Sequence, residues 1–229
     1  MTAWSALRDT LATRRRAWLA LTLGLTLLYY LGLLASASIS TGHLPNYVTF
    51  YDWPANVWRI IRSTPAIGDM PAIINDEWLV ELGAMNYHYG NGVAEWSLEL
   101  IPSHLAVTLV LSALVATSIL LLRRSRAQCA LPEQGAEAMA TGAGALCVAT
   151  ANITMTWVSC CSTPTWVTGL SLIGIETSSA YALLPYGGDL TMAGFAVLLA
   201  TNYLLARRCV PRPPHGAMAL PERLVTLDR

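Results

Sequence analysis

Two adjacent cysteines, Cys160 and Cys161, are the residues of this chain whose type and spacing most clearly suggest chemistry. They lie in a stretch from Ala138 to Ile175 that contains no charged residue, and Pro164 follows shortly after them. Proline removes a backbone hydrogen bond from a helix and clashes with the carbonyl four residues earlier, which here belongs to Cys160. The thiols therefore coincide with a predicted break in a buried or lipid-facing helix, where they either form a soft-metal or redox site or accompany an inert kink.

A soft metal ion is the ligand that this pattern of thiols favours. Thiolates select copper(I), zinc, mercury and similar ions over hard cations, and a divalent ion held by two thiolates is nearly neutral when buried. A spacing of seven residues places several small polar side chains on one face of a continuous helix: Cys147, Thr154, Cys161 and Thr168. Cys147 and Cys161 are about 21 Å apart along such a helix, so they cannot bind the same ion and could only bind it one after the other during transport. The candidate metal ligands are therefore Cys160, Cys161 and Cys147.

The same residues also have structural interpretations. Membrane helices use small and hydroxylated residues to pack closely, and such residues surround Cys147. A redox role is the weaker chemical alternative, because adjacent cysteines close a strained ring on oxidation and lack the C-x-x-C spacing of thiol oxidoreductases. Cys129 and Cys209 each follow an arginine cluster. They are either an inner pair that receives the ion or two unrelated surface thiols. Three isolated histidines are further candidates for binding copper or another ligand: His43, His88 and His104.

The composition is that of a membrane protein. Hydrophobic residues make up 54% and charged residues 12% of the 229 positions, and the mean hydropathy is +0.46. The 14 acidic and 14 basic residues balance, and every basic residue is an arginine. The chain contains no basic groove, glycine-rich phosphate loop or nucleophile elbow. We therefore expect neither a nucleic-acid partner nor an enzymatic activity.

Four membrane-spanning helices are predicted. A spanning helix needs about 20 apolar residues, and three runs provide them: Ala17–Ile39, Leu105–Leu122 and Leu190–Ala206. Arginine clusters before the first run and after the other two place both termini and the loop after the second run in the cytoplasm. The uncharged stretch then crosses once, either as one long helix kinked near Pro164 or as a helix followed by a half-inserted segment. We expect an all-α, multipass protein of a bacterial cytoplasmic (inner) membrane.

Residues 40–104, named the outer segment here, form the only sizeable region between the predicted spans. The segment is rich in tryptophan and tyrosine, which favour the headgroup layer, and it carries seven acidic residues against two arginines. We expect short amphipathic helices on the outer surface of the bilayer. They serve either as a cap over the bundle or as a docking surface for other membrane subunits.

Local patterns predict three features of the outer segment. Asp52 is expected to cap a short helix that runs to Arg62. Asn75 is expected to cap a second helix, whose apolar face has the spacing of Trp78, Leu82 and Met85. Residues 89–92 predict a turn.

The chain is accordingly divided into five parts. These are the cytoplasmic N-terminus with the first helix (1–39), the outer segment (40–104), the second helix with a basic inner loop (105–127), a hairpin of the third and fourth helices that carries the cysteine pair (128–208), and a cytoplasmic tail (209–229).

The hairpin contains a series of short motifs. In order, they are Ser159-Cys160-Cys161 with Pro164, Gly169 and Gly174, Leu183-Leu184-Pro185-Tyr186, and a last span with Gly194 that ends in Ala206-Arg207-Arg208. In this arrangement residues 159–208 resemble the bacterial mercuric-ion transport protein family. The resemblance implies that Cys160 and Cys161 accept the ion from the outer side and pass it inward to a second thiol pair. It covers about 50 of the 229 residues, and two spans and the outer segment precede the hairpin.

Two functions of different classes follow from these patterns. The first is the handling or transport of a thiophilic metal ion, such as mercury or copper, through the vicinal cysteine pair. The alternative is a non-catalytic accessory or assembly subunit of a larger membrane complex, which contacts other subunits through the outer segment.

Overall fold

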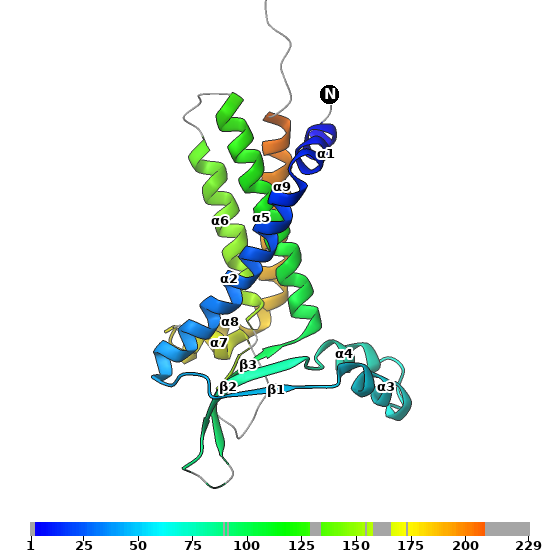
Figure 1. Cartoon of the computed structure of the whole chain (residues 1–229), viewed down its shortest axis with the longest axis vertical. Helices are drawn as coiled ribbons and strands as arrows, with labels where there is room; N and C mark the ends of the chain where they lie inside the picture. The colour runs from blue at the N-terminus through cyan, green and yellow to red at the C-terminus, as the bar shows by residue number, and fades with distance from the viewer. Residues whose placement is uncertain are drawn as a thin grey trace, which may run out of the picture.

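The fold is an elongated helical bundle with a small sheet at one end (Figure 1). The structure, a computed structural model, describes residues 3–88, 90, 92–128, 134–153, 155–157, 166–172 and 174–208. Its long helices are α2 (Arg15–Thr41), α5 (Pro102–Gln128), α6 (Gln134–Ala151) and α9 (Gly187–Arg208), and a short α1 (Ala3–Thr13) precedes α2. The N-terminus and the end of α9 lie at one end of the bundle, and the sheet lies at the other, which we name the sheet end (Figure 1).

Three helices within the described residues are long and apolar enough to cross a membrane. They are Arg15–Thr41, Pro102–Ser125 and Gly187–Arg208. Each contains one of the apolar runs predicted from the sequence, so these three predictions are confirmed. The shortest has 22 residues, or about 33 Å of helix, which matches a hydrocarbon layer of about 30 Å. Their length and composition indicate a membrane protein.

The bundle is held by polar contacts as well as by apolar packing. Between α2 and α5, Thr26 Oγ1 donates to Ser112 Oγ at 3.0 Å. Between α5 and α9, Ser118 Oγ donates to Asn202 Oδ1 at 3.2 Å. Hydroxyl and amide groups on facing helices are a usual means of specific helix association in membranes, because lipid supplies no competing partner. The buried apolar centre takes one residue from each of α5, α6 and α9: Leu111, Val148 and Leu198.

The sheet is the feature that the prediction of an all-α fold did not include. The chain is mostly helical, as expected, but four strands pair antiparallel in the order β1-β2-β3-β4. Their bounds are β1 (Tyr47–Phe50), β2 (Val80–Asn86), β3 (Val93–Leu100) and β4 (Met155–Trp157). Residues of β3 explain the strand conformation, since apolar Trp96 and Leu98 alternate with polar Ser97 and Glu99.

The helices of the outer segment agree only in part with expectation. Asp52 caps α3 (Trp53–Ser63) as predicted, because its Oδ1 accepts from the Ala55 amide at 3.3 Å. The predicted helix after Asn75 is wrong, since α4 (Met70–Asn75) ends at that residue and β2 follows. The strand β2 forms backbone hydrogen bonds with both β1 and β3. This pairing on two sides stabilises the strand more than the helical spacing of its apolar residues would stabilise a helix. The predicted turn at residues 89–92 lies between β2 and β3 in the chain; Tyr89 and Asn91 lie outside the described residues, and Gly90 and Gly92 have positive φ angles, 63° and 98°.

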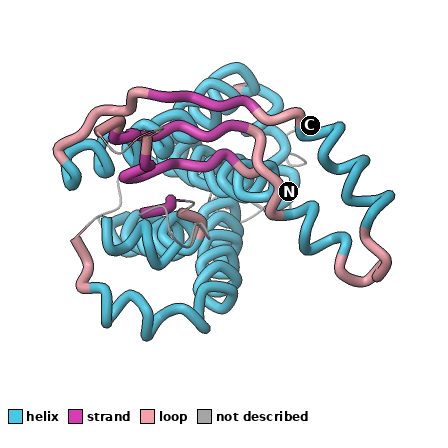
Figure 2. The backbone as a smooth tube through the Cα atoms, turned by 90° about the horizontal axis from the view of Figure 1, so that it is seen from below, coloured by secondary structure: helices cyan, strands magenta, loops and turns pink. Residues whose placement is uncertain are grey.

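A buried apolar cluster joins the sheet to the helices. Trp96 and Leu98 of β3 lie in this cluster with Leu33 and Ala37 near the end of α2. The other buried members are Ala84, Ile153, Val167, Leu170 and Ala180, which include residues of α7 (Trp166–Leu172) and α8 (Thr177–Leu183). A short 3-10 helix, η1 (Leu184–Tyr186), leads into α9. Seen from below, the strands lie across the ends of the helices, and α3 and α4 project to one side (Figure 2).

Candidate functional site

The predicted metal ligands are only partly within the described residues. Cys160 and Cys161 lie outside them, as do Cys129 and Cys209. Cys147 on α6 is a half-buried free thiol. In the part of the chain that the structure describes, no three His, Cys, Asp or Glu side chains are close enough together to hold one metal ion.

Cys147 lies where α6 and α9 approach each other closely. A Cβ placed on Gly194 of α9 would lie 2.7 Å from the Gly144 carbonyl oxygen and 3.1 Å from Cys147 Cβ. A Cβ on Gly144 would in turn lie 3.0 Å from the Gly194 carbonyl oxygen. The two glycines therefore permit a helix contact that larger residues would prevent, as small residues do in membrane helix pairs. This position favours a packing role for Cys147.

The expected line of small polar residues along one long helix is wrong. Because α6 ends at Ala151, the seven-residue spacing does not place Cys147 and Cys161 on a common helical face, and a single helix kinked at Pro164 is likewise not formed. Asn152 supplies a physical reason for the helix end. Its Nδ2 donates to the His104 carbonyl at 2.9 Å and to Thr108 Oγ1 at 2.6 Å, which fixes this residue against α5.

The described residues on both sides of the cysteine pair belong to the sheet end. Cys160 follows β4 after two residues, and Cys161 precedes α7 by four. β4 extends the sheet through the pairing of Trp157 with Trp96. Val167 of α7 is buried in the cluster that contains Trp96. The pair is therefore bracketed by two elements that pack into the same body.

A solvent-open pocket of about 420 Å³ lies beside the sheet, where the chain passes from α2 to β1. Its volume is within the range of small-ligand sites. It brings together groups from three segments of the outer segment, including two of the three candidate histidines. The lining residues are His43, Leu44, Asn46, Ala84, Met85, Asn86, Tyr87, His88 and Glu95.

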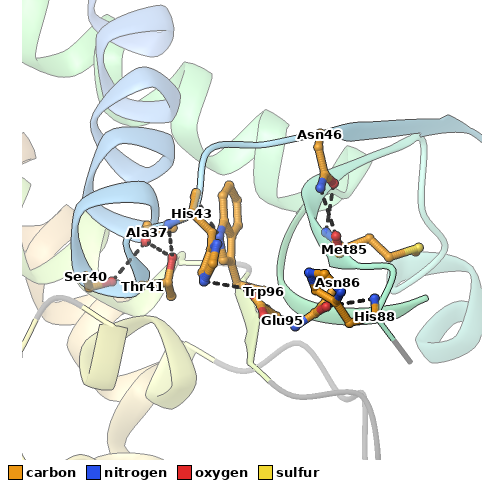
Figure 3. Close-up of polar contacts among 10 residues, drawn as sticks. All are labelled: Ala37, Ser40, Thr41, His43, Asn46, Met85, Asn86, His88, Glu95 and Trp96. Carbon is orange, nitrogen blue, oxygen red and sulfur yellow. Dashed lines mark hydrogen bonds and ion pairs between the residues drawn. The ribbon is translucent and has the colours of Figure 1, made fainter. Parts of the chain in front are cut away.

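The polar groups of this outer pocket are positioned by one another (Figure 3). His43 Nε2 lies 3.3 Å from Glu95 Oε2, while Asn86 Nδ2 donates to Glu95 Oε1 at 2.9 Å. The backbone of His43 is held by Trp96, whose Nε1 donates to the His43 carbonyl at 3.2 Å. Asn46 exchanges two hydrogen bonds of 2.8 Å with the Met85 backbone.

The pocket offers donors of the kind that borderline and soft cations accept. An imidazole and a carboxylate are in contact, and a thioether and a second imidazole line the same hollow. It is not a closed metal centre, since among the imidazole, thioether and carboxylate groups that the structure describes there, His43 and Glu95 alone are in contact. His104, the third candidate histidine, lies apart in the first turn of α5, with a buried Nδ1 that has no hydrogen-bond partner within the described residues.

Sequence reasoning missed a cluster of carboxylates and phenols on the sheet. Glu81 on β2 accepts from Tyr47 Oη at 2.6 Å and from Tyr51 Oη at 2.5 Å. The strand register places Glu81 directly opposite Glu99, which is fully buried and accepts a hydrogen bond from Ser97. Burial and the hydrogen bond to Glu81 raise the pKa of both tyrosines above its usual value. The two-residue alternation of β3 is the sequence pattern that would have revealed Ser97 and Glu99, whereas the pairing that sets Glu81 opposite Glu99 has no local signal.

A second missed pair lies at the opposite end of the bundle. Arg208 Nε is 3.0 Å from Glu137 Oε1, which joins the last turn of α9 to the first turn of α6. Glu137 is almost fully buried, whereas the Arg208 side chain is about half exposed. The negative Glu137 lies at the N-terminal end of α6 and the positive Arg208 at the C-terminal end of α9, where the helix dipole stabilises each charge.

Comparisons with protein-family models, with curated proteins and with solved structures find no match to this chain.

Proposed function

We propose that this protein handles or transports a thiophilic metal ion, such as mercury or copper, through the vicinal thiols of Cys160 and Cys161. The observation that carries the proposal is the position of this pair in the chain. Two thiols occur in a long uncharged stretch, directly between a strand and a helix that both pack at the sheet end. Two neighbouring sulfur ligands match a soft ion far better than a hard one.

The outer pocket supports this proposal. His43, Met85, His88 and Glu95 would be met first by an ion that reaches the sheet end from solvent. Imidazole and thioether groups bind such ions weakly enough to release them, while a thiolate pair binds them tightly. In this scheme the pocket collects the ion and the cysteine pair receives it.

The proposed orientation places the sheet end outside a bacterial cytoplasmic membrane and both termini in the cytoplasm. Arginines at the end of the bundle opposite to the sheet support this, because arginine is retained on the cytoplasmic side. We propose that α6 is a fourth crossing. It lies beside α9, and its Met139 and Leu146 side chains are exposed as lipid-facing residues would be.

Metal binding by the purified, full-length protein tests the proposal. Wild-type protein in detergent is incubated with Hg(II), Cu(I) or Zn(II), and bound metal is measured by elemental analysis after desalting. We expect the Cys160→Ser/Cys161→Ser double variant to bind one equivalent of a soft ion less than the wild type. A Cys129→Ser/Cys209→Ser variant is the matched control and should keep the metal. Equal binding by all three proteins would contradict the proposed site.

A second function, that of an accessory or assembly subunit, is favoured by the free edge of β1. Within the described residues β1 pairs only with β2, and its Phe50 side chain is 76% exposed. An open strand edge can accept a strand from another chain. Under this hypothesis, the cysteine double variant keeps its function in cells, and another membrane subunit co-purifies with the wild type after mild extraction. Thr49→Pro, which disrupts the edge strand, should abolish that association.

A further inference from the structure

The helix α3 is amphipathic, and none of its residues is buried. Helical spacing places Trp53, Val57 and Ile61 on one side, with Trp58 at the boundary of that side. The Trp58 side chain is 55% exposed and that of Ile61 is 43% exposed. Trp53 and Val57 on that side are half-buried, whereas Trp58 and Ile61 are exposed. The exposed apolar groups at this edge of the helix indicate a surface that contacts something else.

The charges on α3 indicate what that surface contacts. The outer segment has seven acidic residues and two arginines, a net charge of −5, and both arginines, Arg59 and Arg62, lie on this one helix. Neither forms an ion pair with a carboxylate in the part of the chain that the structure describes. The Arg62 guanidinium lies over the Trp58 ring, 4.6 Å from its centre. Two cations are thus concentrated beside an exposed indole, in a region that is otherwise acidic.

The position of α3 brings this surface to the edge of the bundle. Together α3 and α4, named the helical arm here, project sideways from the sheet end in both views (Figures 1 and 2). The arm is tied to the beginning of the α5 span, because Ser103 Oγ donates to the Asn75 carbonyl at 2.8 Å. Ile67, in the loop between the two helices, is 80% exposed.

We propose that the helical arm binds the phospholipid headgroup layer of the membrane that the neighbouring helices cross. Trp58 and Ile61 enter the boundary between headgroups and acyl chains, while Arg59 and Arg62 bind lipid phosphates. Tryptophan favours this layer because its ring has an apolar body and a polar N–H group, and arginine can bond phosphate with two N–H groups at once. Surface amphipathic helices bind lipid through this combination of apolar area and basic charge. The inference does not depend on the metal proposal.

The arm favours lipid over a protein partner for a geometric reason. The bond from Ser103 holds the end of α4, and through its packing with α4 also α3, near the depth where the α5 span enters the membrane. The apolar face of α3 therefore meets headgroups wherever the span is inserted, without a second chain. Anionic phospholipids are the species that two arginines without carboxylate partners complement.

Photo-crosslinking in lipid nanodiscs tests the assignment with the full-length protein. The photoreactive residue p-benzoylphenylalanine replaces either Ile61, on the apolar face, or Ser63, on the opposite side of the same helix. The nanodiscs contain labelled phosphatidylglycerol in phosphatidylcholine. We expect at least fivefold more labelled lipid on the protein from position 61 than from position 63. Equal lipid adducts at both positions, or adducts only to another protein chain, would overturn the proposal.

A charge variant tests the role of the arginines separately. Wild type and an Arg59→Gln/Arg62→Gln double variant, each with the crosslinker at position 61, are compared with labelled phosphatidylglycerol and labelled phosphatidylcholine. Each arginine near an anionic surface is worth roughly fivefold in binding. The wild type should prefer phosphatidylglycerol, and the variant should lose that preference while it still forms adducts. An unchanged preference in the variant would show that the arginines do not bind lipid phosphates.

Discussion

The contact between α6 and α9 predicts that Gly194→Ala destabilises the bundle. In a helix interior, alanine is normally about 1 kcal/mol more favourable than glycine. Here the added Cβ would lie 2.7 Å from the Gly144 carbonyl oxygen and 2.7 Å from Val148 Cγ2, well inside the roughly 3.5 Å of an ordinary contact. One of these atoms belongs to the backbone, so α6 and α9 must move apart. Overpacking of this kind costs about 1–3 kcal/mol.

A matched control separates this packing cost from the helix propensity. Gly142 on α6 is exposed, and a Cβ placed there meets no atom within 4 Å. Gly142→Ala thus gains the same intrinsic helix preference without a clash. The difference between the two variants therefore measures the packing cost alone. We expect Gly194→Ala to be less stable than Gly142→Ala by about 1–3 kcal/mol.

Thermal unfolding in detergent measures the difference. The background protein keeps Cys147 as its single cysteine, and a thiol-reactive fluorophore reports when that side chain becomes accessible. For a chain of this size, each kcal/mol corresponds to about 2–4 °C in the unfolding midpoint. Gly194→Ala should also label faster than the control before unfolding, since Cys147 lies beside the added methyl group. Equal midpoints and equal labelling rates for the two variants would refute the described helix contact.

Two further predictions concern the charged and phenolic groups. Arg208→Ala leaves the nearly buried Glu137 carboxylate without its ion-pair partner. The free energy of unfolding in denaturant should fall by about 1–2 kcal/mol, less than for a fully buried pair because the arginine is half exposed. The neighbouring Arg207→Ala is the control and should change this free energy little. Stability should also fall as the pH rises above about 10, because burial and Glu81 raise the pKa of Tyr47 in the folded state, so the unfolded chain loses this proton first. Unfolding followed by tryptophan fluorescence should show a weaker pH dependence for Tyr47→Phe. An identical alkaline profile for the two proteins would contradict this reasoning.

The features that the sequence predicts well are those contained in one segment. Three spanning helices follow from the length of continuous apolar runs, which needs no knowledge of other parts of the chain. The cap at Asp52 is also local, since the side chain bonds an amide only three residues later. In both cases the residues that determine the structure are close neighbours in the sequence.

The sheet could be predicted only in part. The alternation of Trp96 and Leu98 with Ser97 and Glu99 is visible in the sequence and is typical of a half-buried strand. In β2 the helical spacing of apolar residues competes with this alternation, and pairing on both sides decides for the strand. β4 has only three residues, and Trp157 pairs with a residue 61 positions earlier, so no local pattern reveals it.

The candidate site, too, could be predicted from the sequence only in part. Cysteine positions and the histidines of the outer segment can be found by residue type alone. The contact of His43 with Glu95 cannot, because it depends on how the end of α2 meets β3. The helix end at Ala151, which removes Cys147 from any common face with Cys161, depends on the bonds that Asn152 makes to α5.

The pairing of β4 with β3 has a consequence for the biosynthesis of the protein. As the ribosome makes the chain, β1, β2 and β3 emerge first, and both α5 and α6 must be completed before β4 exists. Until then β3 presents an unpaired edge, and such edges promote aggregation. The sheet therefore closes late, and failure to form the two intervening helices would leave it open to proteases and to mispairing.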